Sequence, residues 1–188
     1  TEEEFSLRMA KNLEEKIIKE DPETIAGFVA EPVQGAGGCI PPSKSYFDLV
    51  QPILKKYNIP FIADEVICGF GRTGNLWGCE TYNIKPDIII SSKCLTAGYF
   101  PMGAVIVNKE FSDKFVEVSE EAEEFPHGFT AGGHPVGCAI ALKAIDVIMN
   151  EGLLDNVKLM EPYFFERLNE FNDYEHIGET RGIGLMAA

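Results

Sequence analysis

A carboxylate and an amine follow two apolar segments in a way that could bring them together. Residues 59–63 lead into Asp64, and residues 88–90 lead into Ser91, Ser92 and Lys93. Short runs rich in β-branched residues, separated by helical or loop-like stretches, predict parallel strands that are covered on both faces. Ligands of such sheets bind at the carboxyl ends of the strands. We therefore expect Asp64 and Lys93 to face the same crevice.

An aspartate and a lysine are the two residue types that a pyridoxal phosphate enzyme needs. The lysine amine bonds covalently to the aldehyde of the cofactor, after shedding a proton. The carboxylate keeps the pyridine nitrogen protonated, so that the ring can accept electrons from the substrate. The alternative is that both are solvated groups at strand ends, which is common for charged residues. The pairing by itself leaves both interpretations open.

Five short motifs in a fixed order favour the cofactor interpretation. They are E-P-V-Q-G-A-G-G at 31–38, A-D-E-V-I-C-G-F-G-R-T-G at 63–74, P-D at 86–87, S-S-K at 91–93 and H-G-F-T at 127–130. Together they resemble the class III aminotransferases, or ω-aminotransferases, of the fold type I pyridoxal phosphate superfamily. The resemblance runs from about residue 31 to residue 184.

The resemblance implies a role for each of five residues. Lys93 would carry the cofactor and move the substrate proton, and Asp64 would stabilise the protonated pyridine ring. Val66 would pack against one face of the ring, although ordinary core packing is an equally simple role. Glu31, at a strand end, would line the crevice or form a structural ion pair. Thr130, just before a predicted helix, would bind the phosphate of the partner subunit's cofactor or cap the helix.

The implied reaction is transamination, and two departures from ornithine-type members bear on its substrate. Ala36 takes the place of a glutamate that pairs with a C-terminal arginine, and Ile67 takes the place of a glutamine that reaches the ring hydroxyl. Both changes favour an ω-amino acid or amine as donor and pyruvate or another small keto acid as acceptor. A decarboxylase or aminomutase on the same cofactor is the alternative enzyme, and an inactive fragment without cofactor is the alternative outside enzymes.

The glycines of the second motif also match a dinucleotide-binding fingerprint by letter. Gly69, Gly71 and Gly74 have the spacing G-x-G-x-x-G. That fingerprint requires a helix to open at the third glycine and an acidic residue about 20 positions further on. The sequence after Gly74 is a poor helix opening, so we favour a structural loop.

Three polar residues near these motifs predict structural roles. Arg72 suggests a salt bridge within the glycine-rich loop, and His134 suggests a helix cap or a packing contact. Glu65 suggests a structural ion pair. None of them is needed for the chemistry that Lys93 and Asp64 would supply.

The predicted fold is α/β, the three-layer α/β/α large domain of a fold type I enzyme with a mainly parallel sheet, truncated at both ends. Residues 1–152 would form part of this domain, and residues 153–188 a connecting helix and the start of a small C-terminal domain. The resemblance further implies a homodimer with the site at the interface. We expect the 188-residue chain alone to be inactive. The predicted helices are 2–20, 43–57 (capped by Ser43), 109–116, 134–150 and 154–171, and the predicted strands are 25–33, 60–64, 87–91 and 103–107.

The composition limits which binding partners and which cellular compartment we expect. The net charge of −14 argues against nucleic acid and anionic membranes. No apolar run approaches the length of about 20 residues that spans a bilayer. The cysteines are odd in number and none are spaced Cys-x-x-Cys, so the sequence predicts neither a disulfide framework nor a metal site. Free thiols fit a reducing compartment, and we expect a cytoplasmic protein.

Overall fold

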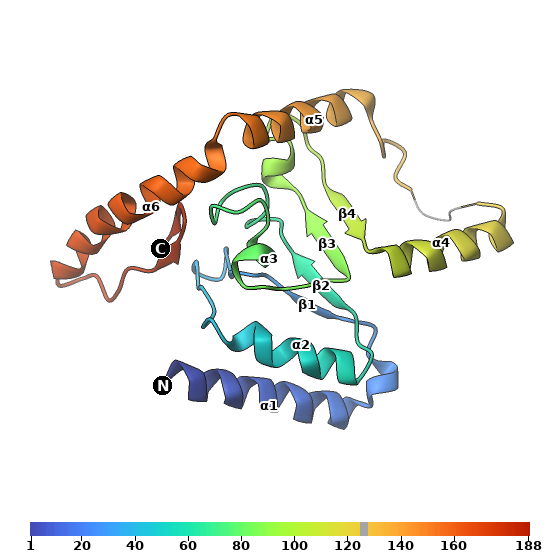
Figure 1. Cartoon of the computed structure of the whole chain (residues 1–188), viewed down its shortest axis with the longest axis horizontal. Helices are drawn as coiled ribbons and strands as arrows, with labels where there is room; N and C mark the ends of the chain where they lie inside the picture. Colours follow the sequence, from blue (N-terminus) through green and yellow to red (C-terminus); the bar gives the residue numbers. More distant parts are fainter. Residues whose placement is uncertain (125–127) are drawn as a thin grey trace.

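A four-stranded sheet forms the centre of the computed structural model, which describes residues 1–124 and 128–188 (Figure 1). Its strands are β1 (Phe28–Ala30), β2 (Phe61–Asp64), β3 (Ile88–Ser91) and β4 (Ala104–Val107), and they lie side by side in sequence order. The first three strands are parallel, and β4 runs antiparallel to β3. The predicted α/β class and mainly parallel sheet are therefore confirmed.

Two helices cover one face of the sheet. Helix α2 (Tyr46–Lys56) packs on it through Phe47, whose ring stacks on that of Phe61 with 5.8 Å between centroids. Helix α1 (Glu2–Glu20) packs on α2 and has the predicted bounds, with Thr1 as its N-cap. The cap predicted at Ser43 is wrong. Helix α2 begins only at residue 46, and the Ser43 hydroxyl instead hydrogen-bonds to a serine hydroxyl of α1.

The opposite face of the sheet is open in the described part of the chain. Val29 of β1 and Val105 of β4 point to this face and are 57% and 67% exposed. Side chains alternate along a strand, which explains why their neighbours in sequence lie on the other face, toward α2. A layer of helices on this second face would complete the three-layer arrangement. That layer stays a prediction for the intact protein.

The second half of the chain is mostly helical. It contains α4 (Lys109–Ala122), α5 (Pro135–Asn150), α6 (Leu153–Asn169) and a hairpin of β5 (Gly182–Ile183) and β6 (Met186–Ala187). Single turns occur at α3 (Gly78–Thr81), η1 (Pro22–Thr24), η2 (Lys93–Leu95) and η3 (Glu170–Asp173). Helix α4 is longer than the predicted 109–116, because the acidic stretch that follows residue 116 continues the helix to Ala122. The domain division at residue 152 stays a prediction, and no helix of the described residues is long and apolar enough to cross a membrane.

Helix α5 closes a second, smaller core above the sheet. Ala141 of α5 packs there with Leu95 of η2 and with Phe70, and all three are at least 92% buried. Pro135 occupies the first turn of α5, as its fixed φ angle favours. This core matters for function because η2 begins at Lys93.

The main core offers a test of the packing. Leu54 of α2 is 2% exposed, whereas Leu7 of α1 is 60% exposed. We expect Leu54→Ala to lower the free energy of unfolding by about 2–5 kcal/mol, because it removes buried methyl groups and leaves a cavity. The matched Leu7→Ala variant should change it by no more than about 0.5 kcal/mol. Equilibrium urea unfolding measures both, and equal effects would contradict the burial described.

The cysteines offer a second test. Cys39, Cys68 and Cys79 are buried, whereas Cys94 and Cys138 are half-buried. Burial raises the pKa of the Cys68 thiol to about 12, so little reactive thiolate forms at that position. A disulfide reagent at mildly alkaline pH should label Cys94 and Cys138 first. In denaturant all the thiols should react alike, and equally fast native labelling of Cys68 would count against this core.

Candidate active site

Asp64 and Lys93 follow neighbouring parallel strands, as predicted. Asp64 is the last residue of β2, and its register partner on β3 is Ile90. The next residue, Glu65, donates its backbone N–H to the Ile90 carbonyl at 2.8 Å. Lys93 follows β3 by two residues and opens η2. The amine and the carboxylate therefore project from the same edge of the sheet.

The Asp64 carboxylate has one oxygen committed within the chain. Its Oδ1 accepts a hydrogen bond from the Val66 N–H at 3.0 Å, which fixes the side chain against its own backbone. Within the described residues no hydrogen bond reaches Oδ2 and no cation pairs with Asp64. The side chain is half-buried. The Oδ2 atom of an oriented carboxylate is therefore available to a ligand.

Lys93 stands at a strained turn. Its φ angle is +40°, in the left-handed region where a residue other than glycine costs about 1–3 kcal/mol. The turn is stabilised by two hydroxyls: Ser92 Oγ donates to the Met102 carbonyl at 3.0 Å and Thr96 Oγ1 donates to the Phe100 carbonyl at 2.6 Å. Lys93 itself is exposed, and its amine has no ion pair among the described residues. Strain maintained by such bonds is typical of functional positions.

These residues fit pyridoxal phosphate. The group needs an amine that can bond to its aldehyde and a carboxylate that can face its pyridine nitrogen. Lys93 offers an unpaired amine, and Asp64 offers an unpaired carboxylate oxygen on the adjacent strand end. The donor set is therefore chemically suited to this cofactor.

The other predicted site residues lie in different settings. Val66 is half-buried directly after the Asp64 strand. Glu31 accepts a hydrogen bond from the Gly35 N–H at 2.9 Å, so it stabilises its own loop. It forms no ion pair in the described part of the chain.

Thr130 is exposed before α5 and makes no described contact with Asp64 or Lys93. His127 of the same motif lies outside the described residues.

The two departures from the ornithine-type pattern are neighbours in the fold. A Cβ atom on Gly35 would overlap the Ile67 side chain, so Ile67 lies directly on the loop that carries Ala36. Sequence alone places these positions 31 residues apart and gives no sign of the contact.

Glu65 is the residue that the sequence underestimates. Its side chain is fully buried, and its two oxygens accept the N–H groups of Gly78 and Cys79 at 2.9 and 2.7 Å. The ion pair predicted for it is not among those of the described residues. An acidic residue next to a strand end gives no local signal of burial, because the partners come from a later turn.

The other polar predictions have mixed outcomes. No ion pair involves Arg72 in the described regions, and its Nε is buried there without a hydrogen-bond partner. His134 precedes α5 without a side-chain cap bond and packs against Phe100, with ring centroids 5.2 Å apart. The packing role predicted for His134 is thus the one observed.

The dinucleotide fingerprint lacks its structural context. No helix opens at Gly74, and the short α3 begins only at Gly78. The Gly71–Gly74 loop instead packs near the C-terminal hairpin, where the Leu185 N–H donates to the Arg72 carbonyl at 3.1 Å. Residues 1–124 and 128–188 also contain no group of three or more His, Cys, Asp or Glu placed to bind a metal.

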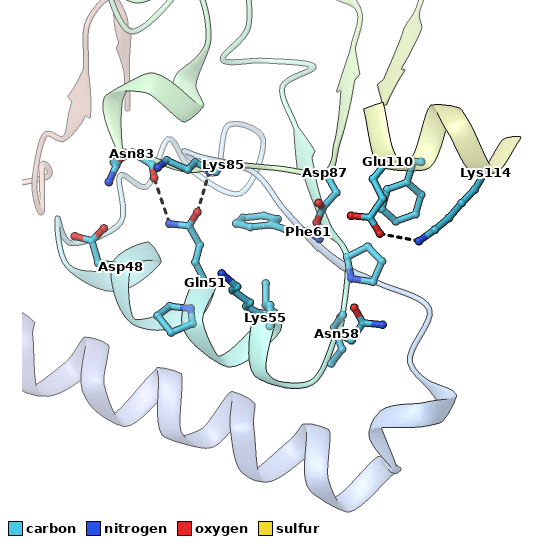
Figure 2. A pocket seen from close by; sticks show the side chains of 15 residues that line it. Asp48, Gln51, Lys55, Asn58, Phe61, Asn83, Lys85, Asp87, Glu110 and Lys114 are labelled. Carbon is cyan, nitrogen blue, oxygen red and sulfur yellow. Dashed lines mark hydrogen bonds and ion pairs between the residues drawn. The ribbon is translucent and has the colours of Figure 1, made fainter. Parts of the chain in front are cut away.

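A hollow of about 840 Å³ lies at the other end of the strands, near the starts of β2 and β3 (Figure 2). Two of its polar side chains already bind backbone groups. Gln51 accepts the Lys85 N–H at 2.8 Å, and Asp87 accepts the Phe61 N–H at 2.9 Å. In Figure 2 the charged side chains come from several elements and form no convergent set. We therefore locate the active site at the Asp64–Lys93 edge.

Comparison with known proteins agrees with this geometry. Residues 1–188 match the family described as aminotransferase class-III. The chain is 55% identical over 186 residues to gamma aminobutyrate transaminase 3, chloroplastic, of Solanum lycopersicum, covering 99% of this chain and 36% of that protein. An omega-aminotransferase from Paracoccus denitrificans superposes with a TM-score of 0.96 at 61% identity, over 100% of this chain and 42% of that one.

A cofactor-bound relative extends the comparison. A PLP-bound aminotransferase mutant from Vibrio fluvialis is 64% identical, with a TM-score of 0.96 over 100% of this chain and 41% of that one. The chain thus spans about two fifths of the length of these relatives. Pyridoxal phosphate, predicted from the lysine and the aspartate, is confirmed as the cofactor of the family. The family match along the whole chain and the placement of Asp64 and Lys93 together lead to one conclusion: this chain belongs to the class III aminotransferases.

Proposed function

We propose that the intact protein is a transaminase that uses pyridoxal phosphate to transfer an amino group from an amine or ω-amino acid to a small keto acid. The observation that carries the proposal is the placement of Asp64 and Lys93 after adjacent parallel strands. When bound, the cofactor supplies an electron sink for the pair of electrons left as a proton leaves the substrate carbon.

Lys93 has two tasks in this proposal. Its Nζ would hold the cofactor through the cofactor's aldehyde, and the same amine, when free, would move the proton at the substrate carbon. The left-handed turn presents this amine outward from the strand end, and the second core beneath Leu95 keeps the turn in place. A rigid support is needed because proton transfer requires hydrogen-bond reach.

Asp64 would bind the ring nitrogen. Its free Oδ2 would accept a hydrogen bond from the protonated pyridine nitrogen, while the bond from Val66 N–H to Oδ1 fixes the direction of the carboxylate. Val66 would pack against the ring. Glu31 would line the crevice through the loop that it stabilises, and Thr130 would bind the phosphate across a homodimer.

Substrate preference is proposed from two sources. Ala36 and Ile67 leave no polar group where ornithine-type members have glutamate and glutamine, and Ile67 packs directly over the Ala36 loop. Relatives named as gamma aminobutyrate transaminase and omega-aminotransferase support an ω-amino donor. Pyruvate or another small keto acid is the proposed acceptor, and the cytoplasm is the proposed location. Release of carbon dioxide from the donor, instead of amino transfer, would favour the decarboxylase alternative.

The first test concerns the covalent site. Borohydride reduction of the intact holoenzyme followed by peptide mass spectrometry should find the cofactor on Lys93, because that amine is unpaired at the strand end. Lys93→Ala should abolish turnover. The control is Lys109→Ala, which removes an exposed lysine paired with Asp113 and should keep full activity. An adduct on a different lysine would refute the assignment.

The second test concerns the ring nitrogen. Asp64→Asn keeps the shape of the side chain but removes its charge, so the cofactor should remain bound while kcat falls about 100- to 1,000-fold, the usual effect of removing a preorganised charge-stabilising group. Steady-state kinetics measure this loss. The control, Asp113→Asn, changes an exposed aspartate of α4 that pairs with Lys109. A near-wild-type kcat in Asp64→Asn would contradict the electron-sink role.

A further inference from the structure

Glu65 is a buried acid whose carboxylate interacts with backbone N–H groups and with the Cys79 side chain. Its two oxygens accept the N–H groups of Gly78 and Cys79, and no cation pairs with it among the described residues. Burial raises the pKa of this carboxyl, and its hydrogen bonds with the Cys79 side chain and with the two N–H groups act in the opposite direction. An acid in this position is unfavourable unless both oxygens are satisfied. The site is therefore built around a carboxylate.

The space around this carboxylate is closed on every described side. A Cβ atom at Gly78 would lie 2.7 Å from the Cys68 Cβ and 3.2 Å from Glu65 Oε2. The Gly69 N–H also donates to the Glu65 carbonyl at 2.8 Å. Residues 66–77 thus form a loop whose two ends meet at Glu65.

Glu65 is also tied to the sheet and to Asp64. Its N–H bond to the Ile90 carbonyl extends the pairing of β2 with β3 by one residue beyond Asp64. Because successive side chains on a strand point to opposite faces, burial of Glu65 on one face directs Asp64 to the other. On its far side, Val66 N–H bonds back to Asp64 Oδ1.

We propose that Glu65 is a positioning residue, whose buried carboxylate fixes the Asp64–Val66 backbone so that the Asp64 carboxylate faces the pyridine nitrogen. The inference rests on the proposed function, since it requires Asp64 to be the partner of the cofactor. Glutamine cannot replace the acid fully. Its amide nitrogen is a donor, so one of the two buried N–H groups would lose its acceptor.

A double-mutant cycle in the intact holoenzyme tests this proposal. Glu65→Gln should lower kcat about tenfold or more while changing KM for the amine less than about threefold, the pattern of a lost transition-state interaction. In the Asp64→Asn background the same change should cost less than about twofold, because Glu65 acts through Asp64. With ¹⁵N-labelled cofactor, the pyridine nitrogen resonance of Glu65→Gln should move toward its unprotonated position.

The matched control is Glu80→Gln. Glu80 is an exposed acid on α3, the short helix that also contains Gly78 and Cys79. It accepts the Trp77 N–H at 3.0 Å, and the loss of its charge should leave kcat and the ¹⁵N resonance unchanged. If Glu65→Gln fails to fold, Glu65→Asp keeps the charge with a shorter side chain and should show the same non-additivity with Asp64→Asn.

Four results separate the hypotheses. Additive losses in the cycle, or an unmoved ¹⁵N resonance, would overturn the positioning role and leave the proposed function intact. Wild-type kcat in both Glu65 variants would do the same. A wild-type kcat in the single variant Asp64→Asn would instead refute the proposed function, because that function gives Asp64 a role in the reaction.

Discussion

The parallel pairing of β2 with β3 is the interaction on which the rest of the structure depends. It aligns Asp64 with Ile90 and brings the ends of both strands to one edge of the sheet. The bond from the Glu65 N–H to the Ile90 carbonyl extends this pairing past Asp64. A slip of one residue in the register would turn Asp64 into the core and Glu65 out of it, because the side-chain period of a strand is two. The α2 side chains Phe47 and Leu54, packed beneath β2, disfavour such a slip.

Two consecutive acids show how environment divides chemical roles. Asp64 is half-buried and keeps a free oxygen, whereas Glu65 is fully buried and uses both oxygens on backbone N–H groups. The residue types are nearly the same, so the difference comes from the face of the chain on which each lies. Burial raises the pKa of the Glu65 carboxyl, and its hydrogen bonds act in the opposite direction. In the proposed positioning role, this buried acid orients the acid that is available to a ligand.

The lysine side of the site relies on a different device. Lys93 lies in a strained turn, and the strain persists because Ser92 and Thr96 bond to carbonyls ahead of β4 and because Leu95 is buried under α5. Helix α5 also follows the segment that carries Thr130. The second core therefore connects the covalent site with the proposed phosphate contact, and a change in α5 packing would act on both.

Local patterns in the sequence determined a large part of this protein. The apolar runs located β2, β3 and β4, and the helices predicted at 2–20 and 134–150 match α1 and α5 closely. Residue chemistry suggested Asp64, Lys93 and pyridoxal phosphate, and the order of the short motifs favoured that interpretation over solvated strand ends. What only the tertiary structure decided involves partners distant in the chain. The sequence could not show that Glu65 binds Gly78 and Cys79, that Ser43 bonds to α1 instead of capping α2, or that Ile67 covers the Ala36 loop. The physical reason is that propensity and periodicity act over one or two turns of chain, whereas burial and hydrogen-bond satisfaction are settled only when distant segments meet.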